Sequence, residues 1–366
     1  MKRKLDIWLF CDARSIHSIK WINALREREH RLRIFSPWQG MLTNENVTVK
    51  ETPQSPIPLP NSIKTLGKVL MRARNGRRIR AELLTNPPDI IHAHYILDSG
   101  WMAAQLDFHP FIVTIHGSDL LIHPERSRLL RIIANRVLKS CDKIVIVGDH
   151  MRQKLIDYKV SEKKIINVPS FIDTSVFYPT RKSQKNNVIT IGSARNFEPV
   201  YKVETLIKAI PEMLKKFTNF ELQLAGSGTQ YQYLRSIIKK LEIEQYVKFL
   251  GILDQKKISD FFRNLDIYVS TAISDGISVT LLEALACGAY PVVTDIIGNK
   301  IVLAKAGDGV FFTPEDSNSL ANILIDVIKN FNRLDQKRKF YSESIIKEYD
   351  KQTVVKKMED IYFELL

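Results

Sequence analysis

Cysteine is scarce in this chain, and its few cysteines cannot form a cross-linked or zinc-held scaffold. Among 366 residues only Cys11, Cys141 and Cys287 occur, far apart and without a CxxC spacing. Disulfide frameworks and structural zinc sites need clustered cysteines. We therefore expect the three to be small buried hydrophobic side chains.

Long apolar runs are also missing. No segment approaches the roughly 20 apolar residues that a helix needs to span a bilayer. The N-terminal stretch MKRKLDIWLFCD becomes charged again before a signal-peptide core could form. These absences predict a cytoplasmic protein.

Acidic residues are too few to balance the basic ones, and the difference lies mainly in the first half of the chain. The net charge is +14, and residues 1–180 hold 28 Lys and Arg against 17 Asp and Glu. An anionic partner is therefore expected for this half. Nucleic acid is not expected, because no binding motif and no interleaving of aromatic and basic residues accompanies the charge.

The densest basic stretch, residues 64–80, predicts an amphipathic helix with a cationic face. Its apolar positions, Ile63, Leu66, Leu70 and Ala73, recur at helical spacing. Two interpretations stay open: a solvated helix face, or a surface for an anionic membrane or a phosphate-bearing acceptor.

Short apolar runs bounded by polar residues or turn signals recur through both halves. The first half contains LDIWLF, LRIF, DIIHAHY, FIVTIHG, KIVIVG and KIINVP, and the second contains VITIGS, ELQLAG, VKFLG, DIYVST, YPVVTD and GVFFT. Segments of helical period lie between them. The alternation predicts an α/β fold of two tandem Rossmann-like, doubly wound domains that face a cleft, joined within residues 168–187.

The segment STAISDGISVTLLEALACGAYPVVTD, residues 270–295, is the most informative part of the chain. It predicts a strand end, an acidic loop with Asp275, a helix that begins near Ser278 to Thr280, and a further strand. Gly276 allows close backbone approach, and a helix N-terminus binds anions such as a diphosphate.

Glu283 follows Asp275 by eight positions and has two interpretations. Its carboxylate could bridge the two ribose hydroxyls of a nucleotide. Alternatively, Thr280-Leu-Leu-Glu283 fits a capping box that closes the start of the helix. On spacing alone, the capping box is the simpler interpretation.

Together with its surroundings, this segment resembles the E-x7-E signature of the retaining glycosyltransferases of family 4, usually seen as EGFGxxxLEAMAxGxPVV. VPSFIDTSVFYP resembles the family's interdomain stretch VPNGVDxxxFxP, and LQLAGSG, VKFLG, DIYVST and GDGVFFTPEDSNSLANIL follow in the expected order. The resemblance covers residues 89–330.

The resemblance implies the GT-B architecture, with an acceptor-side domain at residues 1–172, a donor domain at 173–340 and a C-terminal helix at 341–366 that crosses back to the first domain. It implies transfer of a sugar from a nucleotide sugar, most often a UDP- or GDP-sugar, without a metal or other cofactor. The matching expectations are a glycan or lipid-linked acceptor, a role in cell-envelope polysaccharide or glycolipid synthesis, and a place at the inner membrane face.

Roles then follow residue by residue in the donor domain. Glu283 matches the second signature glutamate and should hold the ribose, whereas Asp275, one methylene shorter than the first, should contact the donor sugar. The diphosphate is expected at the helix start, where four residues offer backbone or hydroxyl groups: Gly276, Ser278, Val279 and Thr280.

The family's G-R-L-x3-4-K-G is replaced here by GSARNFEPVYKVETLI, residues 192–207. Arg195 is expected to clamp the phosphates and Lys202 to be the second cation, because fixed cations stabilise the departing diphosphate. In the best register Tyr201 takes the family's lysine position and Lys202 its glycine position. A solvated loop cation is the alternative for both Arg195 and Lys202.

Gly226-Ser-Gly228 lacks the third glycine of a dinucleotide fingerprint. Two interpretations remain for Gly226: a strand-to-helix turn beside the nucleotide, or ordinary turn chemistry.

In the first half, FIVTIHGSD resembles the family's HGxD-type site, so His116 is expected to hydrogen-bond the transferred sugar or to orient the acceptor. His92 and His94 share one face of their strand. A zinc site with His116 is disfavoured, because no further ligand stands at a known spacing, and a cleft-lining role is expected instead. Ser15 and His17 could reach an acceptor.

The resemblance also implies retention of configuration. No carboxylate pair of the kind that retaining glycosidases use is evident, so a front-face displacement assisted by the leaving phosphate is expected. Two rivals stay open: a nucleotide-sugar epimerase on the same two-domain plan, and a basic non-catalytic binding module. A pyridoxal-phosphate phosphorylase is not expected, because the chain is short for one and no cofactor lysine is apparent.

Overall fold

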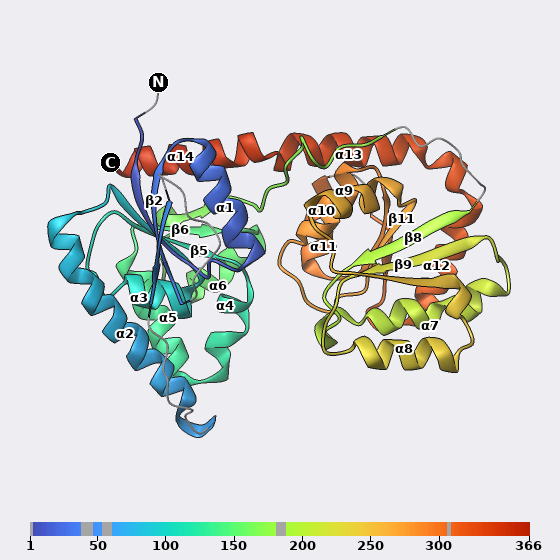
Figure 1. Cartoon of the computed structure of the whole chain (residues 1–366), viewed down its shortest axis with the longest axis horizontal. Helices are drawn as coiled ribbons and strands as arrows, with labels where there is room; N and C mark the ends of the chain where they lie inside the picture. The colour runs from blue at the N-terminus through green and yellow to red at the C-terminus, as the bar shows by residue number, and fades with distance from the viewer. Residues whose placement is uncertain (1–2, 38–46, 53–60, 181–187, 306–308) are drawn as a thin grey trace. The chain divides into compact units, whose positions relative to one another are not determined.

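The computed structural model describes residues 3–37, 47–52, 61–180, 188–305 and 309–366. The chain divides into two compact units. Unit 1 comprises Met1–Pro169 together with Val354–Leu366, and unit 2 comprises Ser170–Thr353. Each unit is a sheet with helices packed against it (Figure 1).

Unit 1 is built on a parallel sheet whose seven described strands have the order β3-β2-β1-β4-β5-β6-β7. The strands are β1 (Asp6–Phe10), β2 (Arg31–Ser36), β3 (Val47–Glu51), β4 (Ile90–His94), β5 (Phe111–Ile115), β6 (Lys143–Ile146) and β7 (Ile165–Asn167). Its main helices are α1 (Ile16–Glu27), α2 (Asn61–Thr85), α3 (Trp101–Ala103), α4 (Ser118–Leu121), α5 (Arg128–Ser140), α6 (Arg152–Asp157) and α14 (Lys351–Leu365). A π-helical turn, η1 (Tyr95–Gly100), follows β4.

Unit 2 repeats the plan with the strand order β10-β9-β8-β11-β12-β13 in its described part. The strands are β8 (Ile189–Ala194), β9 (Phe220–Ala225), β10 (Val247–Gly251), β11 (Ile267–Ser270), β12 (Tyr290–Thr294) and β13 (Phe311–Phe312). The helices are α7 (Val203–Leu214), α8 (Tyr231–Lys240), α9 (Gln255–Asn264), α10 (Val279–Ala286), α11 (Ile297–Lys305), α12 (Ser317–Lys329) and α13 (Asp335–Tyr349). The prediction of two Rossmann-like, doubly wound α/β units is thereby confirmed.

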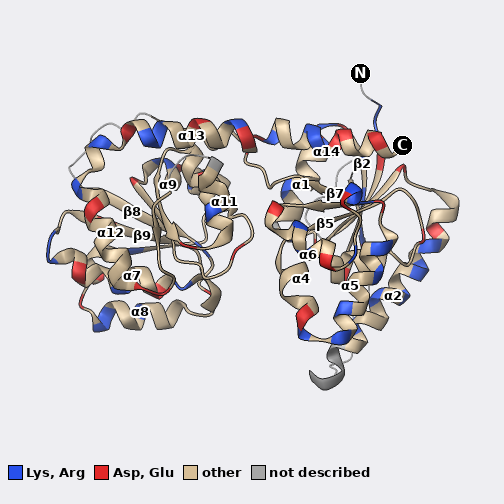
Figure 2. Ribbon diagram, turned by 180° about the vertical axis from the view of Figure 1, so that it is seen from behind, with Lys and Arg blue, Asp and Glu red and all other residues tan. Residues whose placement is uncertain are grey.

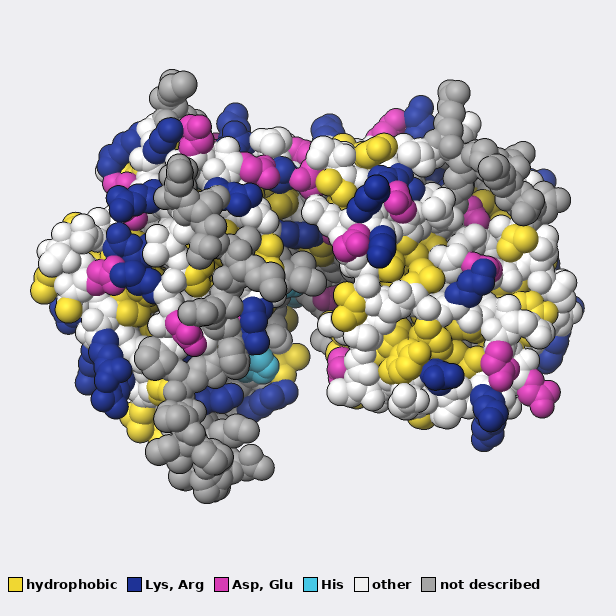
Figure 3. Space-filling view, viewed as in Figure 1, with side chains coloured by type: hydrophobic (Ala, Val, Ile, Leu, Met, Phe, Trp, Pro, Cys, Tyr) yellow, Lys and Arg dark blue, Asp and Glu magenta, His cyan; other side chains and the backbone are white. Residues whose placement is uncertain are grey.

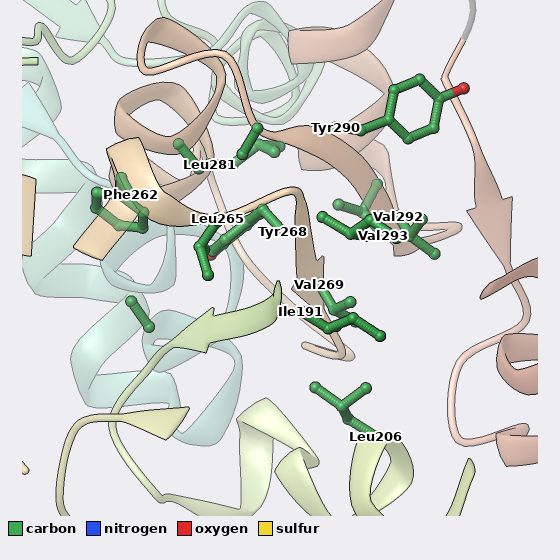
Figure 4. Packing of buried hydrophobic residues seen from close by; sticks show 14 of the residues in the cluster. Ile191, Leu206, Phe262, Leu265, Tyr268, Val269, Leu281, Tyr290, Val292 and Val293 are labelled. Carbon is green, nitrogen blue, oxygen red and sulfur yellow. The ribbon is translucent and has the colours of Figure 1, made fainter. Parts of the chain in front are cut away.

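The strands form where the apolar runs predicted them, because strands covered by helices on both faces are apolar throughout. Each of the twelve predicted runs is a strand. In unit 2, side chains of β8, β11 and β12 share one buried hydrophobic cluster with those of α7, α9 and α10. Figure 4 labels Ile191, Leu206, Phe262, Tyr268, Leu281 and Val292 among them. This packing fixes the carboxyl ends of the strands, from which the site residues follow.

One strand, β3, has no counterpart in the sequence prediction. It lies at the edge of the unit 1 sheet, paired only with β2. Its sequence VTVKE places a lysine and a glutamate among two valines, and only Val47 is fully buried. An edge strand needs no continuous apolar run, so composition does not reveal it.

Helix α2 forms across the basic stretch, but its packed face agrees only in part with the predicted one. Leu66 and Leu70 are exposed, Leu70 by 61%. Of the predicted positions, Ala73 does pack against the unit 1 core, together with Val69, Ile79 and Leu83, and the side chain of Ile63 lies outside the described residues. Gly76 lets the helix approach closely, since a Cβ there would lie 2.3 Å from the Met102 carbonyl oxygen. None of the helices in the described ranges combines the length and apolarity that bilayer crossing requires.

The chain end contributes to both units in turn. Helix α13 packs on α10 in unit 2, where Ser342 donates to the Ala286 carbonyl at 2.8 Å. Asp350 then interrupts the helix, and its backbone forms a parallel bridge with Ile172. Beyond it, α14 buries a stripe of side chains in unit 1: Val354, Val355, Met358, Ile361 and Tyr362.

Two buried polar contacts anchor α14 in unit 1. Glu359 Oε1 lies 3.1 Å from His30 Nε2, and His30 Nδ1 accepts from the Leu5 backbone N–H. That acceptor role places the His30 proton on Nε2, from which it is donated to Glu359. The Tyr362 hydroxyl lies 2.7 Å from Nδ1 of His92 on β4.

We predict that Tyr362→Phe destabilises unit 1 by about 1–3 kcal/mol, because it leaves the buried Nδ1 of His92 without its partner while keeping the ring. Urea unfolding measures the change. Tyr233→Phe, which removes a tyrosine hydroxyl from an exposed position on α8, is the matched control. Equal unfolding free energies for the two variants would show that the contact contributes nothing.

Candidate functional site

In each unit the strand order reverses at one place, and ligands of doubly wound sheets bind beyond the carboxyl ends of the strands there. In unit 2 the reversal lies between β8 and β11, and in unit 1 between β1 and β4. Arg195 follows β8, and the loop that carries Asp275 follows β11. His94 ends β4, and His116 follows the neighbouring β5.

Arg195 is the centre of the unit 2 cluster. Its side chain is only 8% exposed, and its Nη1 lies 2.9 Å from Asp275 Oδ2. Its Nη2 donates to the hydroxyl groups of Ser270 and Ser278. The guanidinium also lies 5.2 Å from the ring centre of Tyr201. The structure therefore brings Arg195, Asp275 and Ser278 together, as expected for one site.

The electrostatics of the cluster keep Arg195 charged. Burial alone would lower the pKa of its guanidinium, but Tyr268, Asp275 and Tyr201 together raise the pKa above its ordinary value. Two polar atoms are nevertheless buried without a hydrogen-bond partner: Arg195 Nε, and Asp275 Oδ2, whose contact with the guanidinium lacks hydrogen-bond geometry. The cluster thus holds a fixed positive charge with hydrogen-bonding capacity left over.

The start of α10 lies in the same cluster. Ser278 is the N-cap residue, and its hydroxyl accepts from the Leu281 N–H at 3.2 Å. Thr280 bonds the hydroxyl of Tyr268 at 2.8 Å. The helix begins where the sequence predicted, and the partial positive charge of its N-terminus adds to that of Arg195.

Two glycines allow close backbone packing around these loops. A Cβ on Gly298, near the start of α11, would lie 2.0 Å from the Gly276 carbonyl oxygen. A Cβ on Gly226, whose φ is 137°, would lie 2.0 Å from the Arg195 carbonyl oxygen. Gly226 therefore supports the loop that carries Arg195. This contact gives the glycine a definite role in the turn after β9.

Glu283 does not close the start of α10. The capping-box interpretation is wrong, because the N-cap is Ser278 and the residue three positions later is Leu281. Glu283 lies further along the helix and is 6% exposed. Glu283 is therefore a buried carboxylate in the body of α10.

Lys202 adopts the left-handed backbone conformation, with φ 45° and ψ 42°, immediately before α7. That conformation favours glycine, which agrees with the register that places Lys202 at the family's glycine position. Its Nζ lies 2.8 Å from Glu315 Oε2, and this ion pair raises the pKa of the lysine. Glu315 was not foreseen, because it lies more than a hundred residues away in sequence.

In unit 1, His116 lies within a group of aromatic rings at the carboxyl ends of β4 and β5. Its Nε2 lies 3.0 Å from Nδ1 of His94. The ring of Tyr95 stacks on it at 4.4 Å between centroids, and His17 lies 5.5 Å away. Of the two residues expected near an acceptor, His17 is thus beside His116.

Asp119 fixes the backbone around His116. Its Oδ1 accepts from the N–H groups of His116 and Gly117 at 3.1 and 2.9 Å, and its Oδ2 accepts from the N–H of Ile96 at 3.1 Å. Burial raises the pKa of this carboxyl to about 6, although the three N–H groups oppose the shift. One side chain therefore ties the loop after β5 to the turn after β4.

The three histidines of β4 and β5 do not converge on a common point. His94 and His116 hydrogen-bond one another, while His92 bonds Tyr362 through Nδ1 and Thr114 through Nε2, each at 2.7 Å. Across the described ranges, no group of three or more His, Cys, Asp or Glu side chains is arranged to hold a metal ion.

Two family models match the chain. Residues 15–176 match Glycosyltransferase Family 4, and residues 178–347 match Glycosyl transferases group 1. Together they span both units.

Curated relatives and solved structures agree with these matches. The chain is 22% identical over 293 residues to N-acetyl-alpha-D-glucosaminyl L-malate synthase of Bacillus anthracis, covering 76% of this chain and 75% of the relative. It is 21% identical over 328 residues to phosphatidyl-myo-inositol mannosyltransferase of Mycolicibacterium smegmatis, covering 86% and 80%.

Among solved structures, sucrose-phosphate synthase of Thermosynechococcus elongatus has a TM-score of 0.83 at 16% identity, with 99% of both chains covered. HepE of Anabaena, solved in complex with UDP, has a TM-score of 0.79 at 16% identity, with 99% of this chain and 100% of HepE covered. The chain therefore belongs to the family 4 glycosyltransferases and is a glycosyltransferase of the GT-B fold.

Proposed function

We propose that this glycosyltransferase takes its sugar from a nucleoside diphosphate held at the carboxyl edge of the unit 2 sheet, and transfers it with retention of configuration. The observation that carries the proposal is the buried Arg195 guanidinium at the start of α10. Its Nε is a buried donor without a partner, and buried donors are almost always paired. A phosphate oxygen supplies the missing acceptor.

The helix start completes the diphosphate site in this proposal. Arg195 lies beside Ser278, the N-cap of α10, so guanidinium and helix dipole act on the same anion. The backbone around Gly276, Val279 and Thr280 offers N–H groups from that side. No metal is needed, because these groups supply positive charge where the leaving diphosphate gains negative charge.

Lys202 is the second cation in the proposal. In the described structure its ammonium group pairs with Glu315, which is more than half exposed. An exposed ion pair contributes little stability, so a diphosphate can replace Glu315 at small cost. Tyr201, at the family's lysine position, contacts the Arg195 guanidinium through its ring and cannot supply a charge.

Glu283 is proposed to bind the ribose. With the capping box excluded, a buried carboxylate in the helix that begins at the diphosphate site is suited to accept hydrogen bonds from two neighbouring hydroxyls. Gly226 is proposed to line the same nucleotide through the loop that it supports. Uridine is the base proposed first, because the HepE structures are described as complexes with UDP and with UDP-glucose.

The reaction proposed is a front-face displacement. The bond between the sugar C1 and the diphosphate oxygen breaks, the acceptor oxygen bonds to C1 on the same face, and the acceptor proton passes to the leaving phosphate. Asp275 is held by Arg195 at 2.9 Å, which makes it a poor nucleophile, so it is assigned to a sugar hydroxyl. His116 is proposed to contact the sugar or the acceptor.

The acceptor is proposed to be a glycan or a lipid-linked molecule of the cell envelope, reached at a membrane surface through α2. Leu66, Leu70 and Leu84 share one exposed face of this helix with Arg74 and Arg77. Leucines that enter the lipid boundary beside arginines that meet anionic headgroups are typical of interfacial helices. Lys and Arg recur along α2 in Figure 2, and dark-blue side chains lie over this side of unit 1 in Figure 3.

Arg72 does not belong to that surface. Its side chain is 13% exposed and its Nε lies 3.4 Å from Asp98. Among the side chains of the helix that the structure describes, the exposed cations are Lys68, Arg74, Arg77, Arg78 and Arg80.

We predict that UDP binds with EDTA present as tightly as with magnesium, and that Glu283→Gln weakens UDP binding about 10-fold or more but leaves pyrophosphate binding unchanged. The glutamine keeps the shape and loses the charged acceptor for the ribose. Arg195→Gln should weaken both ligands, because it removes the charge that meets the phosphates. Isothermal titration calorimetry on the full chain measures each constant, with GDP and ADP alongside.

Lys239→Gln, on the exposed outer side of α8, is the matched control and should bind like the wild type. A requirement for magnesium would contradict the metal-independent site. Loss of pyrophosphate binding in Glu283→Gln would contradict the ribose role, and unchanged UDP binding in both site variants would remove the proposed donor site.

We predict that the triple variant Arg74→Gln, Arg77→Gln, Arg78→Gln loses about 10- to 100-fold in partition onto vesicles of phosphatidylglycerol and phosphatidylcholine, at about 1 kcal/mol for each cation near the surface. Co-sedimentation in low salt measures it. The control carries the same charge change on unit 2: Arg235→Gln, Lys239→Gln and Lys240→Gln. Equal losses in both variants, or equal binding to vesicles of phosphatidylcholine alone, would refute a specific role for α2.

A further inference from the structure

The imidazole rings at the carboxyl ends of β4 and β5 form a continuous stack. The ring centroids of His92 and His94 lie 4.8 Å apart with their planes inclined by 30°, and those of His94 and His116 lie 5.2 Å apart with their planes inclined by 27°. His92 and His94 are fully buried, whereas His116 is partly exposed. Only the last ring of the stack is thus able to meet a ligand.

The stack is uncharged. Burial lowers the pKa of His92 to about 3 and lowers the pKa values of His94 and His116 well below the ordinary value, and neighbouring imidazoles add to each shift. The other titratable groups that face the stack are His17, Tyr95, Tyr362 and Asp119. Asp119 directs its oxygens to backbone N–H groups, so it does not hold a proton on any of the rings.

A neutral imidazole carries one proton, so the contact between His94 Nδ1 and His116 Nε2 allows two arrangements. Either His94 donates from Nδ1, or His116 donates from Nε2. In the second arrangement the remaining proton of His94 sits on Nε2, which is buried without a partner. Buried N–H groups without an acceptor are rarer in proteins than unfilled acceptors. The first arrangement is therefore favoured: His94 donates, and His116 keeps its own proton on Nδ1.

We propose that His94 is a positioning residue that holds His116 in its Nδ1–H form, so that His116 presents a neutral hydrogen-bond donor to a hydroxyl oxygen of the bound sugar or acceptor. This inference rests on the proposed role of His116 in sugar transfer. It excludes His116 as a general base, since the nitrogen that it presents already carries a proton and the other is occupied by His94. The leaving phosphate then remains the proton acceptor of the reaction.

Asp119 and His94 divide the task of orienting His116. Asp119 binds its backbone N–H at 3.1 Å, and His94 binds its ring nitrogen at 3.0 Å. Because both the main chain and the ring of His116 are held, the direction of its Nδ1–H bond is set before the substrate binds. Preorganised hydrogen-bond donors of this kind assist catalysis.

The experiment uses the full chain with ¹⁵N-labelled histidine and no ligand, and compares His94→Phe with His94→Asn. Phenylalanine keeps the ring stack and lacks the donor, whereas the asparagine amide nitrogen reaches close to the position of Nδ1. Long-range ¹H–¹⁵N spectra report which nitrogen of His116 carries the proton, and His116→Gln assigns the signals. The wild type and His94→Asn should show the Nδ1–H form of His116 from pH 5.5 to 8. His94→Phe should gain the Nε2–H form and titrate at higher pH.

Hydrolysis of UDP-glucose, in which water receives the sugar and UDP is released, should fall about 10-fold in His94→Phe and stay within about 2-fold of wild type in His94→Asn, with KM changed little in either. If His94→Phe does not fold, His94→Gln replaces it, because its amide reaches toward the Nε2 position and leaves the Nδ1 position empty.

An Nε2–H form of His116 in the wild type overturns the proposal, as does an unchanged tautomer in His94→Phe. A changed tautomer with equal turnover in the two variants overturns the part that concerns catalysis. The tautomer is read without donor, so these outcomes are separate from the Glu283 and Arg195 binding tests, whose failure would reject the donor site and leave the tautomer assignment intact.

Discussion

The burial of one positive charge constrains most of what surrounds the donor site. A guanidinium that is 8% exposed must have compensating partners, and here they come from three separate segments: Asp275 in the loop after β11, Ser270 at the end of that strand, and Ser278 at the start of α10. Because all three must meet Arg195, the end of β8, the end of β11 and the start of α10 are held together. The same contacts that satisfy the charge therefore shape the place where a diphosphate is proposed to bind.

Unit 1 meets a different constraint with neutral groups. Among the stacked histidines, His94 bonds His116, and His92 bonds the hydroxyls of Tyr362 and Thr114. No net charge has to be compensated, so the network specifies proton positions instead of ion pairs.

Local sequence patterns predicted the features that depend on neighbouring residues, namely the buried strands and the start of α10. Buried parallel strands must be apolar on both faces, so the runs in both units predicted their strands. The start of α10 follows from serine and threonine chemistry close by. By contrast, β3 lies at a sheet edge, where Thr48 and Glu51 are exposed, and α2 packs through a face that includes the buried Asn75 and Gly76. Neither residue type signals a buried helix face, so the face was predicted only in part.

The sequence also did not predict the partners of the site residues, because these partners lie far away along the chain. Glu315 meets Lys202, and His94 meets His116, only because strand order brings distant segments to one sheet edge. The capping box of Thr280 and Glu283 failed for the opposite reason, since Ser278, two residues before Thr280, is the N-cap. The motif resemblance assigned Arg195 and Asp275 to one site. It did not reveal that Arg195 forms an ion pair with the Asp275 carboxylate.

The division of the chain has a consequence for biosynthesis. Unit 1 consists of Met1–Pro169 and Val354–Leu366, so all of unit 2 is translated between its two parts. Until α14 leaves the ribosome, His30 lacks Glu359 and His92 lacks Tyr362. Unit 2 can fold as a continuous segment in the meantime. The hydrogen bonds of the histidine stack in the earlier unit are thus completed by the last part of the chain, after unit 2 has been translated.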